Sequence, residues 1–318
     1  MRRRDFIAGL GGAAAWPLAA RAQQAGMPVI GRLYLGTPEA KYLPAFRKGL
    51  SETGYVEGRN VAVEYRWANN DAGRLPELAA ELVRRGVAVI ATSGVNATLA
   101  AQAETKTIPV VFIVGVDVVQ AGLAASLNRP GANITGFTGL SNETLPKRLG
   151  LLHELVPRST HFGALVDPRD DHQSLEAAAA VIGRPIDVVE AVSAREIETA
   201  FPQLVQKGVD ALLVGAGVIF LNRRVQITTL ALYHRLPAIY FDRSFPEAGG
   251  LMSYGTDISG MSHQVGIYTG RILRGEKPSD LPVQQSAKFE FVINLQIARL
   301  LRIEVPPTLI AFADEVIE

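Results

Sequence analysis

Short apolar runs alternate with longer amphipathic stretches from Pro28 onward, and this alternation most constrains the fold. Residues 29–35 and 60–67 favour strands, and residues 42–51 between them favour a helix. Near-continuous runs of Val, Ile and Leu are typical of parallel strands that helices cover on both faces. We therefore expect an α/β protein built on doubly wound, Rossmann-like parallel sheets.

The same alternation begins again about halfway along the chain. Turn-forming residues cluster at 128–133, and the glycine-rich stretch 134–139 is interpreted as a crossover between two lobes. Later strands are expected at 161–166, 186–191, 209–214, 238–241, 251–254 and 289–293. A single helix is expected at 222–234. With 318 residues, of which 48% are hydrophobic, the chain is long enough for two such lobes.

Residues 1–22 have the features of an export signal. Arg2, Arg3 and Arg4 precede an apolar run from 8 to 20, and a small-x-small site ends at Ala22. The adjacent arginines resemble a twin-arginine signal. The apolar run is shorter than the ~20 residues of a membrane-spanning helix. We expect cleavage after Ala22 and a periplasmic mature protein.

Charge and cysteine content exclude several classes of partner. Of 32 basic and 31 acidic residues, the signal holds four arginines and one aspartate, which leaves 28 and 30. This balance disfavours nucleic-acid binding, which needs a basic face. The chain has no cysteine, which excludes disulfides, thiolate metal sites and a lipid anchor attached at cysteine. We expect a monomer that is not anchored to a membrane.

Ligands of open parallel sheets bind beyond the carboxyl ends of the strands. Residues at or near these ends are the candidate ligand-binding set: Gly36, Thr37, Ser93, Gly94, Val95, Asn96, Gly115, Val116, Asp117, Asp167, Gly215, Ala216, Gly217, Asp242, Arg243 and Tyr254.

Some of these residues have two readings. Ser93 and Asn96 fit the N-cap of a helix. The turn at such a helix start can also offer its backbone N–H groups to a ligand carboxylate. Asp117 could accept a hydrogen bond from a ligand amine or cap a helix, and Arg243 could clamp a ligand carboxylate or remain solvated. Of the aromatic residues near strand ends, one or two would contact a ligand: Tyr34, Phe220, Tyr240, Phe241 and Tyr254.

Motifs for catalysis, metals and cofactors are incomplete or absent in the sequence. Gly215-Ala216-Gly217 begins a dinucleotide fingerprint, but Phe220 occupies the position of its third glycine. There is no phosphate-binding loop, no G-x-S-x-G elbow and no zinc-type histidine spacing. Asp170-Asp171-His172 is interpreted as a turn and helix cap. We expect no catalytic residue, metal or cofactor.

Five segments together carry a family resemblance. They are G-L-x-x-x-G-Y-V-E-G-x-N at 49–60, L-N-R-P-G-A-N-I-T-G at 127–136, G-G-L-M-S-Y-G at 249–255, G-R-I-L-R-G-E-K-P at 270–278 and F-E-F-V-I-N-L at 289–295. On these segments, residues 28–318 resemble the ABC-transporter substrate-binding family whose members include tryptophan- and tyrosine-type binders.

The resemblance implies a type I periplasmic-binding fold, a small-molecule solute enclosed by lobe closure, and permease subunits as partners. It also implies that the long helix at 257–273 returns to the first lobe. The expected lobes are 28–138 with 257–280, and 139–256 with 285–318. The chain departs from relatives in having Val95-Asn96, Asp117-Val118 and Gly217 where they often have Thr-Pro, Asp-Pro and Asp. A relative's ligand is therefore not transferred.

The expected function is the delivery of a small molecule, an amino acid or a small organic acid, to an ABC importer. Two alternatives stay open on sequence alone. One is an exported α/β enzyme, either a hydrolase or an oxidoreductase, although the motifs of both are incomplete. The other is a sensor that presents a bound solute to a receptor kinase.

Overall fold

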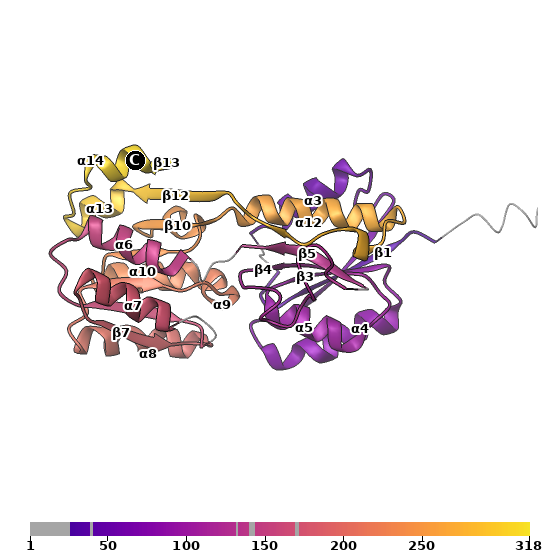
Figure 1. Ribbon diagram of the computed structural model, residues 1–318, viewed down its shortest axis with the longest axis horizontal. Helices are drawn as coiled ribbons and strands as arrows, with labels where there is room; N and C mark the ends of the chain where they lie inside the picture. Colours follow the sequence, from indigo (N-terminus) through magenta and orange to yellow (C-terminus); the bar gives the residue numbers. More distant parts are fainter. Residues whose placement is uncertain (1–25, 39–40, 132, 140–143, 169–171) are drawn as a thin grey trace, which may run out of the picture.

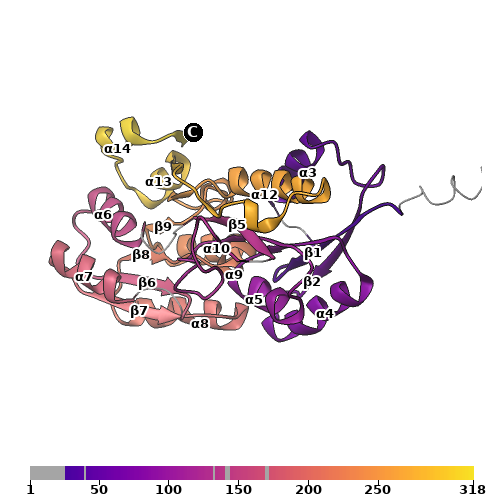
Figure 2. The same ribbon diagram turned by 45° about the vertical axis from the view of Figure 1, so that its right-hand side comes forward.

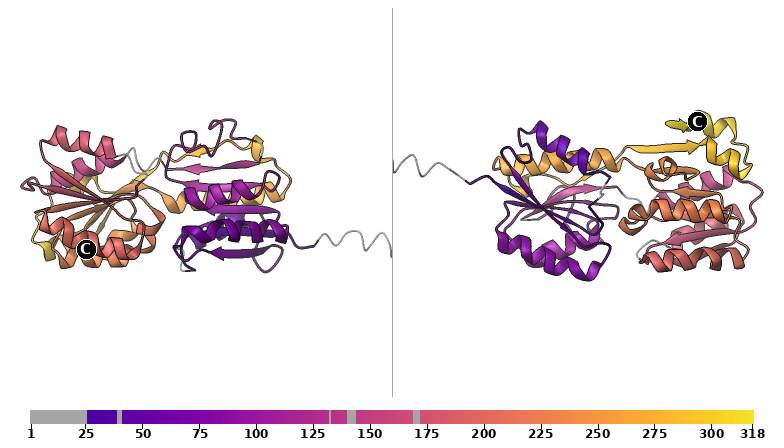
Figure 3. Two further views of the ribbon diagram at one scale, coloured as in Figure 1. Left: turned by 90° about the horizontal axis from the view of Figure 1, so that it is seen from below. Right: turned by 180° about the vertical axis from the view of Figure 1, so that it is seen from behind.

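The computed structural model describes residues 26–38, 41–131, 133–139, 144–168 and 172–318. These residues form two sheet-and-helix bodies that lie next to each other along the long axis of the molecule (Figures 1 and 3). The predicted signal at 1–22 lies outside the described residues, as do Asp170 and Asp171.

The first body is a parallel sheet in the order β11-β5-β4-β3-β1-β2. Its strands are β1 (Val29–Tyr34), β2 (Ala62–Trp67), β3 (Val89–Ser93), β4 (Val110–Val114), β5 (Ile134–Thr138) and β11 (Gln284–Gln285). Helices α4 (Leu75–Arg85) and α5 (Val95–Glu104) pack on one face, and α3 (Leu43–Glu52) and α12 (Ile258–Leu273) pack on the other (Figure 2). The short helix η1 (Ala72–Arg74) leads into α4.

The second body is a mixed sheet in the order β13-β12-β10-β9-β8-β6-β7, in which β12 runs antiparallel to β10. Its strands are β6 (Phe162–Val166), β7 (Ile186–Glu190), β8 (Ala211–Val214), β9 (Ala238–Tyr240), β10 (Met252–Thr256), β12 (Phe289–Asn294) and β13 (Glu315–Ile317).

Helices cover both faces of this second sheet. One core contains side chains of α6 (Leu145–Leu155), α7 (His172–Ile182), α13 (Leu295–Leu301) and α14 (Pro307–Phe312). The other contains side chains of α8 (Ala194–Gln206), α9 (Val218–Asn222), α10 (Arg224–Tyr233) and α11 (Ser244–Glu247). Both sheets therefore have the doubly wound arrangement expected from the sequence.

Helix α12 packs directly against α3 although more than 200 residues separate them (Figure 1). Glycines make this close contact possible. A Cβ atom on Gly49 would lie 1.9 Å from the His263 carbonyl oxygen, and one on Gly266 would lie 2.1 Å from the Phe46 carbonyl oxygen. Asp257 begins α12 by accepting a hydrogen bond from the Gly260 N–H at 2.7 Å. The helix predicted at 257–273 thus lies on the first sheet.

The chain passes between the bodies after β5, after β10 and after β11. The short helix η3 (Pro278–Asp280) joins α12 to β11, and β12 then runs back to the second sheet (Figure 1). The crossover predicted at 134–139 was placed too early, because residues 134–138 form β5 and the chain leaves the first body only after it. Ile134 and Phe137 enter the cores on opposite faces of the first sheet, so β5 is a buried strand despite its glycine and threonine content.

The helix predicted at 222–234 is α10, and a short helix before it, α9, was not predicted. The run Val218–Asn222 was missed because four successive apolar residues show no helical periodicity. This correction affects the site, because α9 begins directly after Gly217.

Candidate functional site

A cavity of about 910 Å³ lies where strand ends of the first sheet face strand ends of the second. Its lining comes from β1, β3 and β4, from the loops after β6 and β8, from the end of β9, and from the start of α12. Its volume lies toward the upper end of the roughly 300–1,000 Å³ that is typical of small-molecule sites.

Nine of the sequence-predicted residues line this cavity: Ser93, Gly94, Val95, Gly115, Val116, Asp117, Asp167, Ala216 and Gly217. Asn96 lines a smaller cavity of about 340 Å³, which shares Ser93, Gly94 and Val95 with the larger one. These residues lie together because the carboxyl ends of parallel strands meet at one edge of a sheet.

The other six predicted residues lie outside the lining: Gly36, Thr37, Gly215, Asp242, Arg243 and Tyr254. The Gly215 N–H donates to the Leu165 carbonyl at 2.8 Å, which extends the pairing of β8 with β6. Tyr254 stacks on Phe289, with ring centroids 5.7 Å apart. Of the five aromatic candidates, Tyr34 and Phe241 line the cavity.

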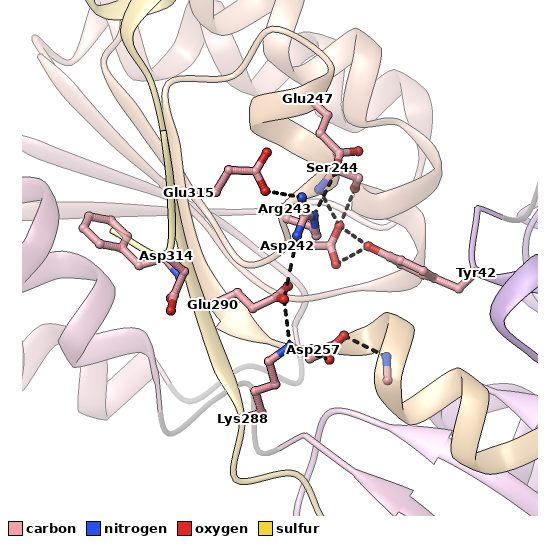
Figure 4. A network of polar contacts seen from close by, with 12 residues as sticks. Tyr42, Asp242, Arg243, Ser244, Glu247, Asp257, Lys288, Glu290, Asp314 and Glu315 are labelled. Atoms are coloured by element: carbon pink, nitrogen blue, oxygen red, sulfur yellow. Dashed lines mark hydrogen bonds and ion pairs between the residues drawn. The ribbon is translucent and has the colours of Figure 1, made fainter. Parts of the chain in front are cut away.

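Arg243 is engaged by three carboxylates of the second body (Figure 4). Its Nε donates to Glu247 at 2.9 Å, a second nitrogen donates to Glu315, and a third lies 3.7 Å from Glu290. The bond to Glu247 is the largest of the effects that raise the pKa of Arg243. Because Arg243 has these partners and lies outside the cavity, the predicted clamp on a ligand carboxylate is not retained.

Asp242 connects the two bodies. It is 3% exposed, and its carboxylate accepts the hydroxyl of Tyr42, the residue that precedes α3, at 2.7 and 2.6 Å (Figure 4). The Ser244 backbone N–H donates to the same carboxylate at 2.9 Å. Burial and the negative charge of Asp242 raise the pKa of Tyr42 well above its usual range. Tyr42 also lines the cavity.

Further contacts hold the bodies together around the cavity. The Asn222 side-chain amide donates to Asn70 Oδ1 at 2.8 Å, and Lys41 forms an ion pair with Glu247. Gly94 has a φ of +87°, and a Cβ atom there would lie 2.8 Å from Val218 Cγ2. Glycine at 94 therefore permits both the turn before α5 and the close approach of the second body.

The predicted N-caps of α5 were wrong, because the N-cap is Gly94 and no side chain caps the helix. Ser93 instead ends β3. Asp117 does act as a local cap, since its Oδ1 accepts the Val119 and Gln120 N–H groups at 2.8 and 2.9 Å. It also lines the cavity, where it could contact a ligand amine.

Arg32 is a lining residue that sequence reasoning missed. It lies on β1, is 4% exposed, and its guanidinium carbon is 4.6 Å from the centre of the Phe46 ring. Its Nη1 is buried and makes no hydrogen bond. Burial lowers the pKa of Arg32. The available signal was an arginine in the middle of an apolar strand, Val29-Ile-Gly-Arg-Leu-Tyr34.

Tyr42, Met261 and Ser262 were also missed, and all three line the cavity. Their positions depend on the packing of α12 against α3, which no local pattern predicts. Ser262 Oγ donates to the Tyr42 carbonyl at 3.0 Å and so fixes the start of α3 against α12.

No cluster of metal ligands is present among the described residues. Within the same ranges, no helix is long and apolar enough to cross a membrane.

A model of the ABC transporter substrate binding protein family matches residues 40–317. The chain belongs to this family. ABC substrate-binding proteins bind solutes and are not enzymes, so the alternative of an exported hydrolase or oxidoreductase is excluded. The tyrosine-binding protein of Clostridioides difficile (strain R20291) is 25% identical over 254 residues, which are 78% of this chain and 73% of that protein.

Solved structures of other proteins are similar to this chain over most of its length. The ABC domain from Streptococcus pneumonia in complex with L-Trp has a TM-score of 0.80 at 25% identity, over 92% of this chain and all of that one. A conserved domain protein from Vibrio cholerae has a TM-score of 0.83 at 25% identity over the same shares. The fold is the type I periplasmic-binding fold, which the chain shares with these proteins.

Proposed function

We propose that this chain is the solute receptor of an ABC importer: it binds an amino acid or a small organic acid between its two bodies and delivers it by closure. The observation that carries the proposal is the cavity of about 910 Å³ between the strand ends of both sheets. A molecule in this cavity contacts both bodies at once, so it stabilises the closed arrangement over an open one.

Contacts around the cavity support closure as the mechanism. Tyr42 and Asn70 of the first body meet Asp242 and Asn222 of the second through hydrogen bonds of 2.6–2.8 Å. Together with the ion pair between Lys41 and Glu247, these bonds link the two bodies. The chain segments after β5, β10 and β11 also join them, and such segments can act as hinges. In this mechanism the permease subunits recognise the closed form, and no covalent step occurs.

The proposal includes export to the periplasm through the signal at 1–22, and a mature protein that acts as an unanchored monomer. It assigns the nine predicted lining residues, from Ser93 to Gly217, to ligand contact. It also keeps the lobes expected from sequence, 28–138 with 257–280 and 139–256 with 285–318, except that β11 (Gln284–Gln285) pairs with β5 and so is assigned to the first lobe.

Thermal-shift screening of residues 23–318 against amino acids, organic acids and sugars tests the receptor function. A solute that binds only the folded protein raises the melting temperature, by an amount that grows with its concentration above Kd. We expect amino acids or organic acids to do so. A second step measures solute uptake by vesicles that contain the permease encoded by the genes next to this one. Uptake that does not depend on this protein, together with activation of a kinase by the loaded protein, would support the sensor alternative instead.

A further inference from the structure

Arg32 is a buried cation with no carboxylate partner among the described residues. It lies on β1 in register with Tyr65 and Ala91, and it shares the α3 and α12 face of the sheet with apolar Ile30. Its guanidinium carbon lies 4.6 Å from the centre of the Phe46 ring. By contrast, Arg243 has Glu247, Glu290 and Glu315 around it.

A buried charge without a partner is costly, because it loses its hydration and gains no ion pair. An arginine keeps its charge in proteins, so neutralisation does not remove this cost. The stacking on Phe46 recovers part of it. An anion bound in the adjacent cavity would pair with this charge and offset the cost of burying it.

We infer that Arg32 receives the carboxylate of the bound solute, and that the solute is a carboxylic acid with a largely apolar body. This inference rests on the proposed receptor function and specifies its ligand class. Among the described lining residues, Arg32 is the only basic side chain. Its planar guanidinium can donate two parallel hydrogen bonds to a carboxylate.

The rest of the lining favours a carboxylate over a phosphate. Asp117 and Asp167 place two acidic groups around the same cavity, so a dianion meets more repulsion than a monoanion. The remaining lining is mostly apolar and includes Leu99, Ile113 and Met261. An acid with an aromatic or aliphatic body would fill this space and keep its charged end at Arg32.

The first test uses the unaltered protein and matched ligand pairs. Thermal shift and calorimetry compare indole-3-propionate with its amide, 4-hydroxyphenylpropionate with its amide, L-tryptophan with tryptamine, and L-tyrosine with tyramine. Phenyl phosphate is the dianionic probe. We expect stabilisation only by members that carry a carboxylate. Equal binding of an amide or amine partner, or tighter binding of phenyl phosphate than of every carboxylate, would overturn the inference.

The second test replaces the charge. Arg32→Met keeps the length and the apolar stem but removes the guanidinium. We expect the affinity for the tightest carboxylate to fall about 100-fold, since the ligand charge is left buried and unpaired. The melting temperature without ligand should stay the same or rise, because a buried unpaired charge is removed. Arg32→Lys keeps the charge but not the planar guanidinium that makes two parallel hydrogen bonds, so its affinity for the same carboxylate should fall about tenfold.

Arg243→Met is the matched control, since it removes an arginine that lies outside the cavity. Its affinity should stay within about twofold of the original protein, in keeping with the small effect of exposed ion pairs. Unchanged carboxylate affinity in Arg32→Met would contradict the inference. If the original protein binds sugars or other neutral solutes alone, the inference fails and the receptor function stands. If it binds no solute of any class, the receptor function itself fails.

Discussion

The Tyr42 hydroxyl donates its hydrogen bond to Asp242 from a distance of 2.7 and 2.6 Å to the two carboxylate oxygens, across the boundary between the sheets. The donor precedes α3 of the first body, and the acceptor follows β9 of the second. Each partner is nearly inaccessible to water, with 9% of Tyr42 and 3% of Asp242 exposed. This bond therefore belongs to the arrangement in which the two bodies are together.

Asp242→Asn should weaken ligand binding about tenfold, mainly through faster dissociation. The substitution removes the charge that strengthens the bond from Tyr42, and hydrogen bonds to charged groups contribute about 1.5–3 kcal/mol. Surface plasmon resonance gives both rate constants. Tyr42→Phe should have a similar effect, and the double variant should be no weaker than the worse single one. Additive losses would show that the two residues act separately.

High pH should open the same contact. The pKa of Tyr42 is raised in the folded protein, so its contribution to stability is complete below the ordinary tyrosine value of about 10 and is lost as the pH rises above it. We expect the melting temperature to fall between pH 9 and 11. The fall should be shallower in Tyr42→Phe, with the other buried tyrosines unchanged. Equal slopes for the two proteins would contradict this assignment.

Gly94→Ala should disfavour the approach of the two bodies. A Cβ atom would meet Val218 Cγ2 at 2.8 Å, and a φ of +87° is strained for alanine. We expect a loss of about tenfold in ligand affinity by calorimetry. Val218→Ala in the same protein should restore the part due to the clash but not the part due to the backbone. No recovery in the double variant would mean that backbone strain alone is responsible.

Arg243→Met should lower the free energy of unfolding by about 1 kcal/mol. Its ion pairs with Glu247, Glu290 and Glu315 are partly exposed, since 30% of its side chain is accessible, and such pairs contribute little individually. Urea denaturation measures the change. A loss of several kcal/mol would show that the cluster acts as a cooperative network.

Gly266→Ala should destabilise the protein by about 1–3 kcal/mol, because a Cβ atom would lie 2.1 Å from the Phe46 carbonyl oxygen and push α12 away from α3. Gly150→Ala is the control on another helix, where a Cβ atom meets no atom within 4 Å. That change should be neutral or stabilising, because alanine favours helices. Denaturation in urea distinguishes the two.

The strands were predictable because their apolar character is local. Val110–Val114 and Phe162–Val166 are continuous apolar runs and form central, buried strands. Ile134–Thr138 was misinterpreted because glycine and threonine also mark turns, and its burial on both faces depends on β4 and on helices from elsewhere in the chain. Local pattern therefore predicts the presence of strands better than their place in the sheet.

The candidate site was predictable only where it follows from strand polarity. Ser93 and Gly115 line the cavity because they end parallel strands. Arg243 also follows a strand, but acidic residues from β12 and β13 draw its side chain away. Arg32 lies within a strand and Ser262 within a helix, so neither satisfies the rule that favours strand ends. Their positions in the cavity lining depend on the packing of α12 against α3.

The contact between α3 and α12 has a consequence for the order of assembly during synthesis. The first body starts near residue 29, yet α12 and β11 are made only after residues 258 and 284 have left the ribosome. The part of the first sheet that α12 covers therefore stays exposed while β6 to β10 of the second body are produced. Contacts between such distant segments form slowly. A chain stopped at residue 256 should therefore expose apolar surface and aggregate. A separate peptide carrying residues 257–318 could complete the fold only by binding to both bodies.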